Sequence, residues 1–145
     1  MMLRNVMARR VARGEGVRQR AAAVVEFAVV LPLLMTILLG IIEYGWVFMV
    51  RQTLQTASRE GCRTAILQTS VEPYTAVLDR ISAVMAPTGL SYSVSMTHAT
   101  SASPIETVEV SIPYNDVSLM GGYFGSHNYD IAGNCSMRKE GLVGS

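Results

Sequence analysis

Residues 21–50 read AAAVVEFAVVLPLLMTILLGIIEYGWVFMV, and this apolar stretch decides what kind of fold the chain can have. Sixteen residues from Phe27 to Ile42 carry no charge, and together with the apolar residues around them they are long enough to span a bilayer as a helix. Aromatic residues of the kind that line a membrane surface follow at the end: Tyr44, Trp46 and Phe48. The stretch therefore predicts a transmembrane helix.

The residues before this stretch are basic. Residues 1–20 contain six arginines and one acid, a charge of +5, whereas residues 21–145 contain six bases and ten acids, a charge of −4. Because cytoplasmic flanks of membrane helices are rich in Arg and Lys, the N-terminus is predicted to stay in the cytoplasm and the C-terminal part to cross the membrane. No aromatic residues interleave the arginines, which disfavours nucleic-acid binding. Small residues precede the apolar stretch instead of following it, which disfavours an ordinary secretory signal.

Glu26 lies near the start of the apolar stretch. A carboxylate inside a membrane-spanning helix is costly, and insertion scales give about 2.5–3.5 kcal/mol for Asp at mid-membrane. Such a residue indicates a function in which a partner offsets this cost. The alternative is a charge that only snorkels to the cytoplasmic headgroups. Glu43, at the other end of the stretch, is predicted to lie among the far headgroups and to pair with Arg51, the alternative being a specific contact in assembly.

The helical pattern continues beyond the membrane-length stretch. Small and apolar residues recur on one face as far as Leu67, which predicts a single helix from about Ala22 to about Leu67. At 1.5 Å per residue this helix is roughly 70 Å long, more than twice the thickness of a bilayer core. Half of it is expected to project from the membrane and to pack on the rest of the chain.

The remaining sequence predicts a small head. Apolar residues at helical spacing between Tyr74 and Met85 indicate a second, short helix. Three segments of alternating polarity, at 90–96, 108–114 and 129–137, indicate an antiparallel three-stranded sheet. The predicted fold class is α+β, a lollipop in which the sheet packs on the distal half of the long helix.

Few residues in the head suggest chemistry. Cys62 and Cys135 are both predicted on the oxidising side of the membrane and on the apolar faces of their elements, so they form either a disulfide, which is favoured, or two buried thiols. His98 and His127 have no further ligand at metal-binding spacing. No catalytic motif is present, so neither a metal, a cofactor nor an enzymatic activity is predicted.

One loop carries apolar residues that the predicted core does not use. It covers residues 115–128, NDVSLMGGYFGSHN, and includes Met120, Tyr123 and Phe124. These side chains form either a contact surface for another subunit or a lid over the sheet edge.

The N-terminal half resembles a known family. Residues 18–65 are similar to the N-terminal region of TadE-like pseudopilins, the minor pilins of the tight-adherence (Flp-type) pilus. The shared features are Glu-Phe at 26–27, Leu-Pro at 31–32, GIIEYG at 40–45, QTL at 52–54 and ASREG at 57–61. The segment CSMRKE at 135–140 also resembles the C-terminal strand of the family.

This resemblance implies a pilin-like fold and a processed N-terminus. In the family a prepilin peptidase cuts on the cytoplasmic side so that the glutamate becomes the fifth residue, which corresponds here to a cut between Ala21 and Ala22. Ala21 departs from the commoner pattern, in which glycine precedes the cut. The new α-amine of Ala22 would be a cationic partner for Glu26, which lies beside Phe27 in the assembly segment.

The resemblance also implies the organisation and partners of the chain. Residues 1–21 are then a cytoplasmic leader that is cleaved, residues 22–50 the transmembrane and assembly half of the long helix, and residues 51–145 a periplasmic α+β head. The protein is expected as a single-pass protein of the bacterial inner membrane, or at the pilus tip after assembly. Its expected partners are the prepilin peptidase, other pilins and minor pilins, the inner-membrane assembly platform and the lipid bilayer.

Two functions are compatible with these features. The first is a minor pilin that initiates or caps a tight-adherence pilus, with Glu26 and the new amine setting the register of the helix bundle. The alternative is an uncleaved single-pass membrane protein whose extracytoplasmic head is a binding or sensory module. The state of the N-terminus separates the two, because only the first requires a chain that begins at Ala22.

Overall fold

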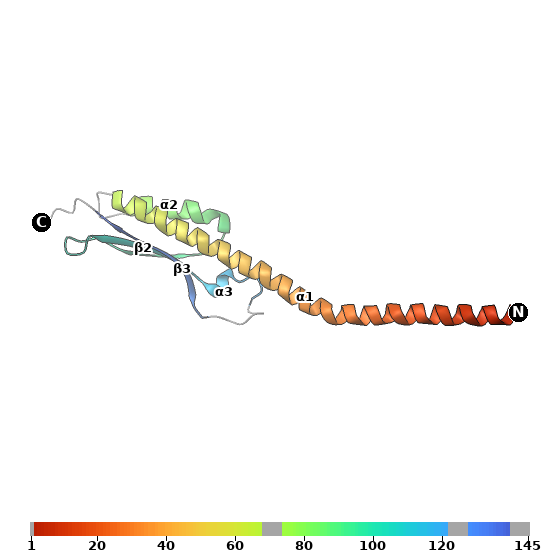
Figure 1. Cartoon of the computed structure of the whole chain (residues 1–145). Coiled ribbons are helices and arrows are strands. Elements are labelled where there is room, and N and C mark those ends of the chain that lie inside the picture. The colour runs from red at the N-terminus through yellow and green to blue at the C-terminus, as the bar shows by residue number, and fades with distance from the viewer. Residues whose placement is uncertain (1, 68–73, 122–127, 140–145) are drawn as a thin grey trace. The chain divides into compact units, whose positions relative to one another are not determined.

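A computed structural model describes residues 2–67, 74–121 and 128–139, with side chains from Arg18 on (Figure 1). Its first element, α1 (Met2–Leu67), is an α-helix of 66 residues. The chain divides into two compact units, Met1–Ile42 and Glu43–Ser145. The first unit is the N-terminal part of α1, and the second contains the rest of α1 and all other elements.

The helix α1 ends at Leu67, as the sequence predicts, but it begins well before the predicted start at Ala22. The residues before Ala22 are rich in Arg, Ala and Met, which favour helix, so the leader continues the same element. The helix also continues through Pro32, whose missing N–H removes one hydrogen bond of the helical ladder.

The second unit has the α+β composition that the sequence predicts. After α1 its elements are α2 (Thr75–Met85), the 3₁₀ helix η1 (Ala86–Thr88), β1 (Ser93–Thr97), β2 (Ile105–Pro113), the single-turn helix α3 (Tyr114–Val117) and β3 (Asp130–Arg138). The strands form an antiparallel sheet in the order β1-β2-β3. The helix α2 and the C-terminal part of α1 lie on the same face of this sheet (Figure 1). The prediction that the sheet packs on the distal half of the long helix is thereby confirmed.

The alternation of side chains along the strands determines which face of the sheet is buried. In β2 every second residue is buried, and the residues between them are more exposed. In α2 the buried residues recur every four positions, which is the spacing of one helix face. The buried hydrophobic residues are Val50, Leu54, Ala57, Cys62, Ala65, Tyr74, Val77, Ile81, Met85, Val108, Val110, Ile112, Val117 and Ile131.

Two glycines let the elements of the second unit approach closely. Gly61 of α1 lies against Ile81 of α2 and Val108 of β2, and a Cβ at this glycine would be 2.9 Å from Cδ1 of Ile81. Gly133 of β3 lies against the backbone of α1, where a Cβ would be 2.5 Å from the amide nitrogen of Gln55 and closer still to the preceding carbonyl group. The helix and β3 therefore meet backbone to backbone at this point.

Polar side chains also connect α1 to β3. The side-chain amide of Gln55 donates a hydrogen bond to the carbonyl oxygen of Asn134 at 2.8 Å. Just after the end of the strand, Nζ of Lys139 donates to the carbonyl oxygen of Ala65 at 3.3 Å. The two bonds are ten residues apart on α1 and fix the position of β3 along it.

Candidate membrane and assembly interface

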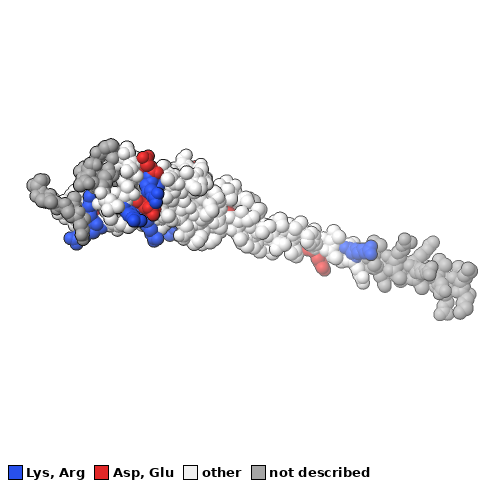
Figure 2. Space-filling model, turned by 90° about the horizontal axis from the view of Figure 1, so that it is seen from above, with Lys and Arg blue, Asp and Glu red and all other residues white. Residues whose placement is uncertain are grey.

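The N-terminal part of α1 exposes an apolar surface. Between Val24 and Ile42 twelve large hydrophobic side chains have exposed fractions from 41 to 73%, and they occur on all sides of the helix. On the face shown in Figure 2, a long stretch of this helix has no Lys, Arg, Asp or Glu. Among the helices that the structure describes, α1 is long and apolar enough to cross a membrane. A helix that is apolar all round requires lipid or other helices to cover it.

The residues predicted for processing and assembly all lie on this exposed helix. Ala21, Ala22 and Glu26 are exposed, and Phe27 has an exposed fraction of 62%. Ala22 and Glu26 are four residues apart, so they lie on one face of the helix, about 6 Å apart along its axis. Within the described ranges, no salt bridge and no side-chain hydrogen bond involves Glu26. Its carboxylate is thus accessible to a partner.

The interpretation of Glu43 from the sequence is wrong in one respect: its carboxylate does not pair with Arg51. Glu43 is only 5% exposed, and it accepts hydrogen bonds from the Ser118 hydroxyl at 2.6 Å and from the backbone N–H groups of Leu119 at 3.0 Å and Met120 at 3.2 Å. The chain after α3 presents two N–H groups and a hydroxyl to a buried position, where donors need an acceptor. The hydrogen bonds from residues 118–120 therefore determine where the Glu43 carboxylate points, and the nearby Arg51 of the same helix does not.

Trp46 adds a second link to the same segment. Its indole N–H donates a hydrogen bond to the carbonyl oxygen of Val117 at 2.9 Å, and the side chain of Val117 is buried. We call Glu43, Trp46 and residues 117–120 the clasp. Of the three apolar residues predicted as a lid or a contact surface, Met120 is half-buried in the clasp, and Tyr123 and Phe124 lie outside the described residues.

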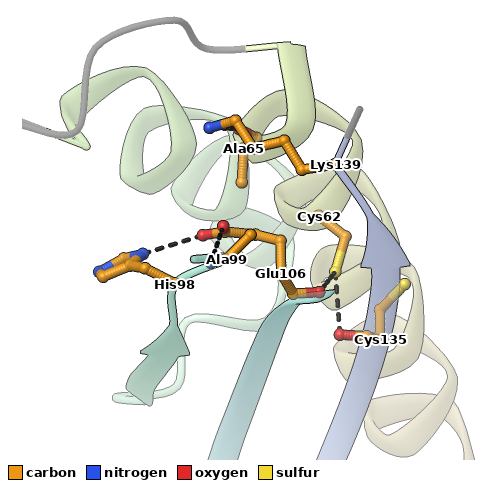
Figure 3. A network of polar contacts seen from close by, with 7 residues as sticks. All are labelled: Cys62, Ala65, His98, Ala99, Glu106, Cys135 and Lys139. Atoms are coloured by element: carbon orange, nitrogen blue, oxygen red, sulfur yellow. Dashed lines mark hydrogen bonds and ion pairs between the residues drawn. The ribbon is translucent and has the colours of Figure 1, made fainter. Parts of the chain in front are cut away.

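A buried carboxylate that sequence reasoning missed lies on the inner face of β2. Glu106 is 1% exposed, and it accepts a hydrogen bond from the Ala99 amide at 2.8 Å and contacts Nδ1 of His98 at 2.9 Å (Figure 3). The His98 ring stacks on Tyr74 with a centroid separation of 4.2 Å. Glu106 therefore holds the turn between β1 and β2 against the start of α2. Within the described residues no three His, Cys, Asp or Glu side chains form a group that could hold a metal ion, and His127 lies outside them.

The two cysteines lie next to each other but are free thiols in the structure. Sγ of Cys62 donates to the carbonyl oxygen of Cys135 at 2.9 Å (Figure 3). Burial, together with the contact to Cys135, raises the pKa of the Cys62 thiol to about 12. The topology thus brings the pair together, as the disulfide requires, and the bond itself stays a prediction.

Comparison with known proteins gives one match. Residues 21–63 match the family model described as TadE-like protein. Searches among curated proteins and among solved structures gave no significant match. The matched segment contains the exposed apolar helix, Glu26, Glu43 and Trp46, so the family match covers both the residues predicted for assembly and the α1 half of the clasp. The resemblance of the N-terminal segment is confirmed over residues 21–63, and that of residues 135–140 stays a prediction.

Proposed function

We propose that this chain, whose residues 21–63 match the TadE-like family model, works as a minor pilin that initiates or caps the assembly of a tight-adherence pilus. The observation that carries the proposal is the exposed apolar helix with a carboxylate, Glu26, one turn after Ala22. An apolar surface of this extent is stable in lipid or against other helices of the same kind, and the two environments correspond to the stored and the assembled subunit.

Processing of the leader is the first step of this proposal. A prepilin peptidase on the cytoplasmic side cuts between Ala21 and Ala22, which removes all six arginines that precede the apolar helix. These charges hold the N-terminus in the cytoplasm, because moving each of them through the bilayer is costly. Their removal leaves a chain of 145 − 21 = 124 residues whose helix can leave the membrane.

The new N-terminus then supplies a partner for Glu26. The α-amine of Ala22 and the Glu26 carboxylate carry opposite charges and lie one helical turn apart, so they pair within a subunit or between adjacent subunits. An unpaired charge in an apolar bundle costs several kcal/mol, whereas a pair costs less. A subunit that joins the bundle is therefore most stable at the axial position at which the Glu26 carboxylate pairs with an α-amine. In this way Glu26 sets the register and the orientation of the helices.

The proposed location follows from the same charges. The helix begins in the bacterial inner membrane with its leader in the cytoplasm, and residues 51–145 form the periplasmic head. The partners are the peptidase, the other pilins of the system and the assembly platform in the inner membrane. The match to the TadE-like family supports a structural role associated with a pilus.

Replacement of Glu26 tests this function. We expect Glu26→Ala to enter the membrane as the wild type does, since the change makes the helix more apolar, and to lower the number of pili per cell about tenfold or more. Glu26→Asp keeps the charge and should retain part of the activity. Pili are counted by electron microscopy in the native host, and the amount of membrane-inserted chain is measured by immunoblotting.

A matched control removes an exposed carboxylate elsewhere. Glu109 lies on the solvent side of β2, and Glu109→Ala should leave the pilus count unchanged. A strain without the gene gives the lower limit. Normal piliation with Glu26→Ala, at wild-type levels of inserted chain, would contradict the proposed role of the carboxylate.

A second candidate function rests on Ala21. Glycine commonly precedes the cut in this family, and a chain that escapes the peptidase would remain a single-pass membrane protein with an extracytoplasmic binding or sensory head. This candidate predicts an intact leader in the native host, together with normal pili in a strain that lacks the chain.

A further inference from the structure

A cavity of about 470 Å³ lies in the second unit, between the first turns of its α1 segment and the start of β3. This volume is in the range of small-molecule sites. The lining residues are Tyr44, Val47, Arg51, Tyr129, Asp130, Ile131 and Ala132. The three helix residues are separated by three and four positions, so they lie on one face of α1. Neither the assembly residues nor the clasp carboxylate lines this cavity.

The lining combines two opposite charges with aromatic and aliphatic groups. Arg51 and Asp130 are both exposed, and in the part of the chain that the structure describes neither has a salt-bridge partner. Val47 and Ile131 supply an apolar wall and are at least partly buried. A ligand that complements this surface carries both an anion and a cation, together with apolar groups. Two unpaired opposite charges in one cavity are a poor match for a simple anion, because the carboxylate would repel it.

The cavity follows the apolar run closely in the sequence. Tyr44 comes two residues after Ile42, the last residue of the uncharged stretch, which is about 3 Å along a helix. Arg51 is two turns further on, yet it lines the same cavity, in keeping with the tilt of helical side chains toward the N-terminus. The headgroup region of a bilayer adds roughly 5–7 Å to each side of the hydrocarbon core. Tyr44 falls within this layer, and Val47 lies at its outer edge.

We propose that this cavity binds the headgroup of a phospholipid that carries both a phosphate and a primary amine, as phosphatidylethanolamine does. Arg51 binds the phosphate, and Asp130 accepts hydrogen bonds from the ammonium group. The apolar wall contacts the glycerol and the first carbons of the acyl chains. This inference rests on the membrane orientation of the proposed function and adds a lipid that holds the head at a fixed height above the outer surface of the inner membrane.

Lipid retention by the purified full chain tests the proposal. The chain is held in detergent with an equimolar mixture of dioleoyl phosphatidylethanolamine, phosphatidylglycerol and phosphatidylcholine, and retained lipid is measured by native mass spectrometry. We expect the wild type to retain phosphatidylethanolamine at least about threefold more than either other lipid. Arg51→Gln should lower that retention about 5- to 10-fold, as expected for loss of one charge-assisted contact in a partly hydrated site.

The second variant and the controls separate this site from general lipid binding. Asp130→Asn should abolish the preference for the amine, so that phosphatidylethanolamine and phosphatidylglycerol are retained equally. Arg59→Gln and Glu109→Gln make the same charge changes at exposed positions outside the cavity and should behave as the wild type. Glu26→Ala should also retain lipid as the wild type does. Lipid retention therefore tests the cavity independently of the proposed role of Glu26 in pilus assembly. Equal retention of all three lipids by the wild type, or an unchanged profile in both cavity variants, would overturn the proposal.

Discussion

At Gly133 the backbone of β3 touches the backbone of α1, and a side chain of any size would collide with it. We expect Gly133→Ala to destabilise the second unit by about 2–3 kcal/mol or to prevent its folding. Neither partner can move away cheaply, because the strand is hydrogen-bonded to β2 and the helix is packed on α2. Urea unfolding of the full chain in detergent, followed by the fluorescence of Trp46, measures the change.

The same substitution at another glycine is the control. No atom lies within 4 Å of a Cβ built at Gly45 of α1, and Ala is favoured over Gly in a helix by roughly 0.5–1 kcal/mol. Gly45→Ala should therefore keep or raise the stability. If Gly133→Ala unfolds at the wild-type urea concentration, the close contact between helix and strand is not required.

The buried thiol of Cys62 makes the free energy of unfolding depend on pH in the alkaline range. Burial raises its pKa from 9.0 to about 12 in the folded chain, so between these values the unfolded chain binds fewer protons than the folded chain. Stability must then fall as the pH rises above about 9. Under reducing conditions we expect the wild type to lose about 1 kcal/mol more than Cys62→Ala between pH 8 and pH 10, measured by urea unfolding. Parallel losses in the two proteins would show that Cys62 does not titrate on unfolding.

Single residues show where sequence reasoning reaches its limit. Glu106 has the same strand parity as Val108, so its inward direction was predictable from the alternation of β2. Its donor at Ala99 was not, because that contact depends on the shape of a turn. For Glu43 the helix itself offers Arg51, whereas the true donors are 75 to 77 residues away along the chain. Local spacing carries no information about such partners.

At the scale of elements, the clasp attaches the chain after α3 to α1. We expect Glu43→Gln to weaken this attachment, because an amide offers one acceptor oxygen in place of a carboxylate that receives three hydrogen bonds. Hydrogen exchange at the amides of Leu119 and Met120 should become about 10- to 100-fold faster, as for the loss of a charge-assisted bond. Exchange of β1 and β2 amides should stay unchanged.

The control for this variant is a neutralised carboxylate outside the clasp. Glu60 pairs with Arg80 across α1 and α2 at 3.2 Å, and both side chains are partly exposed. Glu60→Gln should leave exchange at residues 118–120 at the wild-type rate. Unchanged exchange in Glu43→Gln would mean that Trp46 alone holds the segment.

Whole elements were predictable to a greater extent than their contacts. The end of α1, the second helix and the three strands follow from hydrophobic periodicity, because one apolar face per element is enough to build this core. The start of α1 was placed too late, since a membrane-based argument says nothing about helix propensity in the leader. The turn α3 has four residues and no periodic pattern, and contacts with α1 support it.

At the scale of the whole molecule, the leader and the remaining residues differ in charge but not in secondary structure where they meet. The leader carries +5 and the remaining residues −4, while α1 runs through both regions without a break. The helix alone therefore does not mark where the mature chain begins. In the proposed processing, that boundary depends on the size of the side chain before the cut, where alanine is the next smallest residue after glycine.

We expect the chain isolated from its native host to begin at Ala22, with an intact mass that lacks residues 1–21. Ala21→Gly should be processed at least as completely, because it restores the smaller residue, whereas Ala21→Leu should retain the leader because its side chain adds three carbons beside the cut. Ala12→Leu makes the same change inside the leader and should be processed normally. N-terminal sequencing and intact mass measure all four chains. If the wild type keeps its leader and Ala21→Gly loses it, alanine blocks the peptidase. The uncleaved membrane protein with a binding head would then be the better description.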